Sequence, residues 1–328
     1  MIWLTWRLHR TESLIGLSLI GVLGVAIAIT GLDIAETFRT MGLGACVAGA
    51  AGDEDATRSC FELSNAFFHE FDQLTNLVDW LNFLPVIFAM LLAAPFLNEL
   101  EHGAFRLSWT QSIPRARWAA YRIGAILAAA GLLGGIWGIV MTWWMDPFTE
   151  LRGRMESDSF NFQGIVPIAY FLFSASLLLA AGSISRRTVP TLLAALVVFL
   201  PVRLGIEMKL RPRFQEPLTA IQEVNGPVLS STTGAGPRDW VVADGWVDSL
   251  GNRITGEEMM TLCPPVVRGL VQRGGFDECI RAQGLLRYEE YQPASRFWQF
   301  QLIETAIYVG LAAGLVALAF WWVTRRLA

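Results

Sequence analysis

Uncharged apolar residues gather in six runs along this chain, each about as long as a helix that crosses a bilayer. A hydrocarbon core of roughly 30 Å needs about 20 residues at a rise of about 1.5 Å per residue. Hydrophobic residues make up 53% of the chain and charged residues only 16%, too few for an ordinary soluble surface. We therefore expect an all-α integral membrane protein with six transmembrane helices. The expected spans are residues 14–32, 76–97, 122–144, 165–184, 189–208 and 296–324.

The first thirteen residues follow a different pattern. Trp3 and Trp6 stand at helical spacing beside Arg7 and Arg10, so one helix face is aromatic and another is cationic. This pattern is typical of a helix that lies in the membrane interface, and we expect such an elbow helix over residues 1–13. The apolar run that follows is long for a secretory signal and lacks an Ala-x-Ala cleavage site, so we interpret it as the first span.

The arginines give the expected orientation. Ten of them fall in or beside the termini and the loops on one side of the six spans. The positive-inside rule makes that side cytoplasmic, and both termini lie on it. The cytoplasmic segments are then 98–121, 185–188 and 325–328, and the extracytoplasmic segments are 33–75, 145–164 and 209–295.

The longest extracytoplasmic segment, 209–295, is punctuated by glycine and proline and contains short regular stretches such as Trp240–Val242 and Gly256–Met260. Its length exceeds that of an ordinary connection between helices. We expect a small extracytoplasmic subdomain before the last span, mostly helix and loop.

All four cysteines fall in the two segments that the arginines place outside the cell. Disulfides persist in oxidising compartments, so this distribution fits two bridges, most simply Cys46 to Cys60 and Cys263 to Cys279. Four cysteines allow three pairings. The alternative is four free thiols or a zinc site, although the intervals do not match paired Cys-x-x-Cys ligands.

Composition and motifs exclude several functions. The net charge of −4 and the dispersed basic residues give no stripe for nucleic acid. The phosphate loop Gly-x-x-x-x-Gly-Lys-Ser/Thr is missing, because the only lysine, Lys209, stands in no such context. A membrane enzyme that acts on lipid should show clustered catalytic groups, whereas the histidines at 9, 69 and 102 are scattered. We expect no catalytic residue, metal site or cofactor in this chain.

Three ionisable residues fall inside or near the expected spans: Asp79, Arg203 and Glu304. Each is costly in hydrocarbon unless it is paired or faces a wet cavity. Span five runs outward and span six inward, so Arg203 and Glu304 come to a similar depth toward the outer leaflet and are able to pair. An ion pair that fixes helix packing and a substrate or gating role both remain open.

The segment from Asn98 to Arg122 is the most informative in the chain. It combines an acidic pair, a glycine break, an aromatic turn and a basic return into the third span. A charged and aromatic element between two spans is suited to dock in a groove on a soluble partner. The alternative is a plain interfacial helix on lipid headgroups. The candidate docking residues are Glu99, Glu101, Gly103, Phe105, Trp109 and Arg115.

Three stretches carry a resemblance to a known family. They are Trp3 to Arg7; the run of Glu99, Glu101, Gly103, Ser108, Trp109, Thr110, Gln111, Ser112, Arg115 and Trp118; and the ending with Tyr291, Gln292, Pro293, Arg296, Phe297, Trp298, Gln301, Glu304 and Trp321 to Arg326. With these motifs the chain resembles the ABC-2 type permease family. Ala104 departs from the usual threonine after the glycine, which puts a specific polar contact there in doubt.

The resemblance implies the permease subunit of an ATP-driven exporter in the bacterial inner membrane. It implies a cytoplasmic coupling helix between spans two and three, a second permease copy or a related permease, and a separate ABC ATP-binding subunit that holds ATP and magnesium. Closure of that ATPase would move the coupling segment as a lever on the spans. A hydrophobic or amphipathic cargo, such as an antibiotic or a lipid, is expected. The alternative is a sensory or assembly subunit that detects a ligand through its extracytoplasmic segment.

Overall fold

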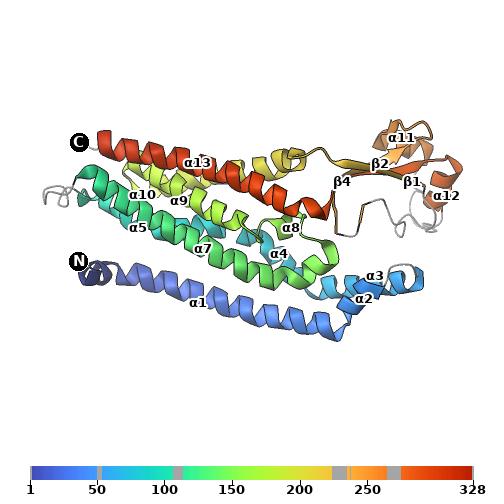
Figure 1. Ribbon diagram of the computed structural model, residues 1–328, viewed down its shortest axis with the longest axis horizontal. Helices are drawn as coiled ribbons and strands as arrows, with labels where there is room; N and C mark the ends of the chain where they lie inside the picture. The colour runs from blue at the N-terminus through green and yellow to red at the C-terminus, as the bar shows by residue number, and fades with distance from the viewer. Residues whose placement is uncertain are drawn as a thin grey trace.

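The computed structural model describes residues 2–49, 54–105, 114–223, 235–236, 238–263 and 275–326. It is a long helical bundle with a small sheet at one end (Figure 1). The chain enters α1 and leaves α13 at the end of the bundle that is far from the sheet, and we call this the terminal end. We call the end near the sheet the sheet end. The helices are α1 (Ile2–Thr40), α2 (Leu43–Gly49), α3 (Glu54–Glu70), α4 (Asp72–Leu81), α5 (Leu84–Glu101), α7 (Arg115–Arg152), α8 (Ser157–Phe160), α9 (Val166–Ser185), α10 (Thr188–Gly205), α11 (Gly256–Leu262), α12 (Gly275–Ala282) and α13 (Phe297–Arg325).

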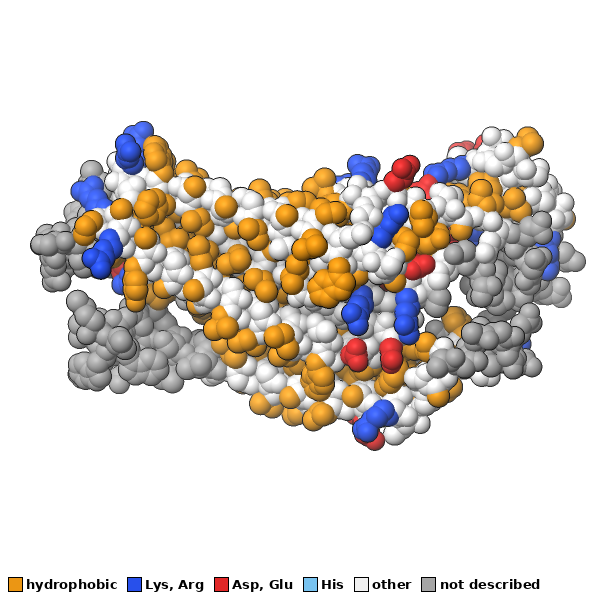
Figure 2. All heavy atoms as spheres, viewed as in Figure 1, with side chains coloured by type: hydrophobic (Ala, Val, Ile, Leu, Met, Phe, Trp, Pro, Cys, Tyr) orange, Lys and Arg blue, Asp and Glu red, His pale blue; other side chains and the backbone are white. Residues whose placement is uncertain are grey.

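Six helical segments in the described part of the chain are long and apolar enough to cross a membrane, which confirms the expected number of spans. Helix α9 is the most buried of them and packs against α5, α7, α10 and α13. The face in Figure 2 carries a middle zone of apolar and uncharged side chains, with the charged groups toward the two ends. Such a zone is what a lipid-facing surface requires. The six segments are Ile20–Thr40, Leu84–Glu101, Arg115–Arg152, Val166–Ser185, Thr188–Arg213 and Ala294–Arg325.

Helix α1 covers both the expected elbow helix and the expected first span, with no helix end between them. It continues to Thr40, beyond the expected limit of the span. The expected loop 33–75 is largely helical, since α2, α3 and α4 follow. Phe67 of α3 packs edge-on against Phe38 of α1 and also contacts Phe148 of α7, so apolar packing holds this segment to the bundle.

The fifth span does not end where its α-helix ends. After Gly205 the chain passes through a π-helical turn (Ile206–Leu210) and a 3-10 turn (Arg211–Arg213). A π-helical turn inside a helix often marks a functional position. Here it extends the apolar segment to Arg213 and places Arg211 within the bundle, although the expected extracytoplasmic segment 209–295 includes that residue.

The subdomain before the last span contains a four-stranded antiparallel sheet, which the expectation of a subdomain made mostly of helix and loop did not include. The strand order is β1-β4-β2-β3. Helices α11 and α12 pack beside it through a small separate cluster that includes Met259 and Ile280. The strands are β1 (Leu218–Glu223), β2 (Trp240–Val247), β3 (Arg253–Ile254) and β4 (Leu286–Gln292).

The sheet subdomain contacts the bundle where two backbone segments come close together. Gly153 ends α7 with φ of 84°, and a side chain there would meet the carbonyl of Arg238. Only glycine combines that backbone angle with so close a contact. The Nε of Arg238 also donates to the carbonyl oxygen of Glu150 at 3.1 Å.

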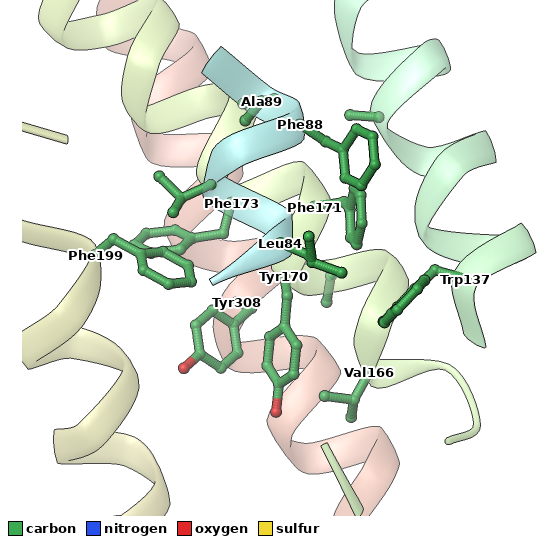
Figure 3. Packing of buried hydrophobic residues seen from close by; sticks show 14 of the residues in the cluster. Leu84, Phe88, Ala89, Trp137, Val166, Tyr170, Phe171, Phe173, Phe199 and Tyr308 are labelled. Carbon is green, nitrogen blue, oxygen red and sulfur yellow. The ribbon is translucent and has the colours of Figure 1, made fainter. Parts of the chain in front are cut away.

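The main core lies between the spans and is rich in aromatic rings. Phe88 stacks on Phe171, and Phe173 stacks on Phe199 (Figure 3). Tyr170 and Tyr308 lie edge to face, with ring centroids 4.9 Å apart. In Figure 3 their hydroxyls point away from the phenylalanine rings. The apolar core therefore gives way to polar groups toward the sheet end.

Candidate functional site

At the terminal end, two carboxylates in the last turn of α5 hold neighbouring helices. Glu99 forms an ion pair with Arg122 of α7. The carboxylate of Glu101 accepts from the backbone N–H of Thr188, the first residue of α10, at 2.9 Å and from the hydroxyl of Thr188 at 2.5 Å. Both acids of the expected docking segment therefore have partners inside this chain.

Beyond α5 the chain turns at Gly103, whose φ of 70° lies in the left-handed region. Phe105 follows and is buried against Trp118 of α7, which in turn stacks on Phe96 of α5. The aromatic side chain at 105 thus anchors the start of the segment in the bundle. Arg115 is exposed at the first position of α7.

Residues 106–113 of the expected coupling segment, Trp109 among them, lie outside the described residues. A shallow surface hollow lies between the last turn of α5, the residues that follow it and the turn that joins α9 to α10. Its lining residues are Leu100, Glu101, His102, Gly103, Phe105 and Arg186.

The turn between α9 and α10 is tightly built. Arg186 adopts φ of 54°, an uncommon angle for a residue other than glycine. Its guanidinium donates to the carbonyl of Arg326 at the end of α13, 3.2 Å away. The hydroxyls of Ser185 and Thr191 lie 2.5 Å apart across the turn. This turn therefore connects the terminal ends of three spans.

At the sheet end, the fully buried carboxylate of Glu304 is the centre of a polar cluster. Arg211 donates to both of its oxygens, from Nε at 2.7 Å and from Nη2 at 2.8 Å. The hydroxyl of Tyr170 donates to the same carboxylate at 2.5 Å. Arg211 reaches further to Asn161 at 2.7 Å. A bidentate pair of this kind is the strongest form of arginine–carboxylate contact.

Arg203 is the second cation of this cluster and is held less directly. Its Nη1 lies 3.5 Å from Glu304 and 3.8 Å from Glu207, while its Nη2 donates to Asn82 at 3.1 Å. The guanidinium also lies over the ring of Tyr170, 3.7 Å from the centroid. The two arginines and the two glutamates balance in charge, which lowers the cost of burying them.

Sequence reasoning identified Arg203 and Glu304 but missed Arg211, the residue that makes the closer contact with the carboxylate. Arg203, Glu207 and Arg211 recur every fourth residue, which places them along one helix face, and this spacing was a usable signal. Tyr170 and Asn161 gave no such signal, because they come from α9 and the segment before it.

Asp79 is not part of this buried cluster. It is exposed in α4, outside the candidate span that begins at Leu84. The chain leaves the helix at Asn82, and Pro85 stands in the first turn of α5, a favoured place for proline. The expected second span, 76–97, therefore starts before the helix that crosses the membrane, because the apolar pattern continues across the boundary between α4 and α5.

Two carboxyls lie near the cluster but outside the spans. Burial raises the pKa of Asp158, and the nearby charges of Asp79 and Glu207 raise it further. Burial likewise raises the pKa of Glu156, against the lowering effect of Arg152. Both groups therefore favour the protonated form more than a free carboxyl does.

The four cysteines form two bonds in the structure. Cys46 joins Cys60 and links α2 to α3, with Cα atoms 5.5 Å apart. Cys263 joins Cys279 and links the end of α11 to α12, with Cα atoms 5.8 Å apart. Of the three possible pairings, the structure has the one between sequence neighbours.

Comparisons with known proteins place this architecture in a family. A family model described as ABC-2 membrane transporter related matches residues 17–211, more than half of the chain. The match runs from α1 to Arg211 and so includes the last turn of α5, the turn between α9 and α10 and most of the sheet-end cluster. No curated protein and no solved structure matches the chain. The sheet and α13 lie beyond the matched residues.

Proposed function

This chain belongs to the ABC-2 membrane transporter related family, and from that membership we propose that it is the permease subunit of an ATP-driven exporter. The observation that carries the proposal is the family match across five of the six candidate spans. A permease of this type takes its energy from a separate ABC ATP-binding subunit, which supplies the ATP and magnesium site.

The partner ATPase docks at the terminal end, which is then the cytoplasmic side of a bacterial inner membrane. The segment between α5 and α7 is the docking element. Its described start is anchored by Phe105, and its flanks are held by Glu99 and Glu101. A rigid base under a docking segment supports transmission of force from the ATPase.

The permease works as a homodimer or with a related permease, and the cargo passes between the two. A hydrophobic or amphipathic compound, such as an antibiotic or a lipid, suits the apolar surfaces of the spans. ATP moves the permease because the closed ATPase fits one permease state better than the other.

Assembly and hydrolysis test this proposal. The purified chain should hydrolyse no ATP by itself and should gain hydrolysis when it is reconstituted with its ABC ATP-binding subunit. Vectorial ATP-dependent flux of a hydrophobic compound in proteoliposomes should accompany it. A wild-type chain that co-purifies with no ATP-binding subunit would contradict the proposal.

A second candidate function follows from the sheet subdomain. It lies outside the matched residues and carries its own small hydrophobic cluster and a disulfide. A sensory subunit would use it to detect a ligand and would use the ATPase only for signalling. In that case a ligand bound by the subdomain should alter ATP hydrolysis without being carried across the membrane.

A further inference from the structure

The first turn of α10 receives its cap from another helix. The first N–H groups of a helix have no partner within it. In α10, Pro190 has no N–H, and the residue before the helix, Arg187, provides no side-chain cap. Glu101 of α5 fills this place, since one of its oxygens accepts from both the N–H and the hydroxyl of Thr188. A carboxylate at a helix N-terminus is also favoured by the helix dipole.

The same turn of α5 holds α7 through a different residue. Glu99 and Glu101 are two positions apart, about 200° around a helix, so they point to different sides. One side contacts Arg122 of α7 and the other contacts Thr188 of α10. The chain that leaves this turn is the segment between α5 and α7. Any displacement of that segment therefore acts on two spans through two separate contacts.

We propose that Glu101 is a positioning residue that transmits movement of the segment between α5 and α7 to α10, and that it does so from inside the permease. This inference rests on the proposed function, because the movement comes from the partner ATPase. Its consequence reaches the sheet end, since α10 continues to Arg203 and then to Arg211 in the buried cluster. Removal of the cap should leave the docked complex in place and separate its motion from that of α10.

Distance measurements between spin labels test the inference on the full complex with the partner ATPase. Cysteines introduced at Leu193 of α10 and Leu132 of α7 are suitable sites, because both side chains are exposed. The four native cysteines are already bonded in pairs, so the labels would be the only free thiols. In the wild-type background, ATP with magnesium should change the distance between the two labels.

Glu101→Ala should abolish this ATP-dependent change while the ATPase still co-purifies with the permease. Thr188→Val removes the hydroxyl bond and keeps the backbone bond to Glu101, so it should reduce the change without abolishing it. The double variant should show no larger effect than Glu101→Ala alone, because both bonds end on the same carboxylate. Thr324→Val is the matched control. Its hydroxyl, at the same end of the bundle, bonds only within α13, so the change should persist.

Three results would overturn the inference alone. Loss of ATPase binding in Glu101→Ala would make Glu101 a direct contact with the partner, and an unchanged label response in both variants would make the cap irrelevant to motion. A wild-type complex whose labels do not respond to ATP would also overturn it. Failure of the wild-type chain to bind any ATPase would instead overturn the proposed function and the inference together.

Discussion

Residue by residue, the most consequential position is Glu304, because one buried carboxylate serves two arginines. Arg211 holds both of its oxygens, whereas Arg203 lies at 3.5 Å and is held mainly through Asn82 and the ring of Tyr170. Removal of Arg211 would leave Glu304 with one distant cation. This asymmetry makes Arg211 the position at which a packing role of the cluster is tested.

Arg211→Met should destabilise the permease by about 3–5 kcal/mol, because it breaks a buried pair and leaves a charge without its main partner. Glu304→Gln should cost a similar amount, and the double variant should cost less than the sum. Thermal unfolding in detergent, followed by size-exclusion chromatography, measures the effect. Arg213→Met, two residues away at an exposed position, is the control and should behave like the wild type. Equal stability of Arg211→Met and the control Arg213→Met would show that the cluster does not stabilise the fold.

Asp158 should make the stability of the protein depend on pH. Its pKa is raised in the folded state by burial and by the negative charges of Asp79 and Glu207. A carboxyl with a raised pKa stabilises the fold most below its ordinary pKa, near 3.8, and this contribution is lost as pH rises through the folded value. Asp158→Asn should therefore raise the free energy of unfolding at pH 7 by roughly 0.5–1 kcal/mol, a small amount because the group is partly exposed.

The difference between Asp158→Asn and the wild type should shrink as the pH falls toward 4. Thermal unfolding at a series of pH values measures it. Asp146→Asn, a change in α7 at a residue with exposed side chain, provides the comparison. A difference that stays constant over the whole pH range would show that the titration of Asp158 does not contribute.

At the level of elements, the pair of helices beside the sheet depends on its disulfide. Among the described residues, the cluster under α11 and α12 holds four buried side chains, a small core for two short helices. The bond joins Cys263 and Cys279, which are separated by 16 positions in the sequence. A closure of that length contributes roughly 3 kcal/mol in the chain-entropy description.

Replacement of Cys263 and Cys279 by serine should loosen α11 and α12 while leaving the spans folded. Hydrogen exchange should rise over residues 256–262 and 275–282, and it should stay unchanged in α9. The matched control replaces Cys46 and Cys60, whose bond links α2 to α3. That change should affect its own segment and not the sheet. Non-reducing peptide mapping of the wild type should recover both linked pairs.

For the whole molecule, the bundle and the sheet subdomain have separate hydrophobic clusters. The two ends of the subdomain also lie close together, since the amide of Gln292 donates to the carbonyl of Gln215 at 2.8 Å. A short linker is therefore able to replace the sheet without stretching the chain.

Replacement of residues 216–291 by a linker of about four glycine and serine residues should leave a folded bundle that still assembles with its ATPase. The helical circular dichroism and the elution volume of the complex measure this result. Retained ATP-dependent flux would favour the exporter over the sensory subunit. Loss of assembly would show that the sheet is part of the permease fold. Insertion of the same linker after Gly251, at a turn in the sheet, is a control for the linker itself.

The sequence predicted the six spans because the length of an apolar run is a local property. It missed the true ends of α1 and α7, which continue as helices beyond the residues that hydropathy can detect. The sheet was missed for a similar reason. Strand β4 reads Leu-Arg-Tyr-Glu-Glu-Tyr-Gln, with charges that hide a central strand, and its neighbours lie far away in sequence.

At the candidate sites, too, the sequence indicates single residues and local motifs but not their contact partners, which lie far away in the chain. The acidic pair of α5 was visible as a motif, but nothing local indicates that Glu101 meets Thr188, 87 residues away. Glu304 was recognised as a charge in an apolar run. Its partner Arg211 is 93 residues distant and lay beyond the expected end of the fifth span.

The ion pair between Arg211 and Glu304 also sets an order of events during synthesis. The ribosome completes both arginines of the cluster, and then the whole sheet segment, before it reaches Glu304 in α13. Until that last helix arrives, Arg203 and Arg211 have no Glu304, and the surface of α9 that α13 will cover is open. The two arginines then share one glutamate, Glu207, and the charge that is left unbalanced is costly in hydrocarbon. The newborn protein must therefore keep the sheet end of its fifth span near water, or under the protection of the insertion machinery, until its final helix brings the carboxylate into place.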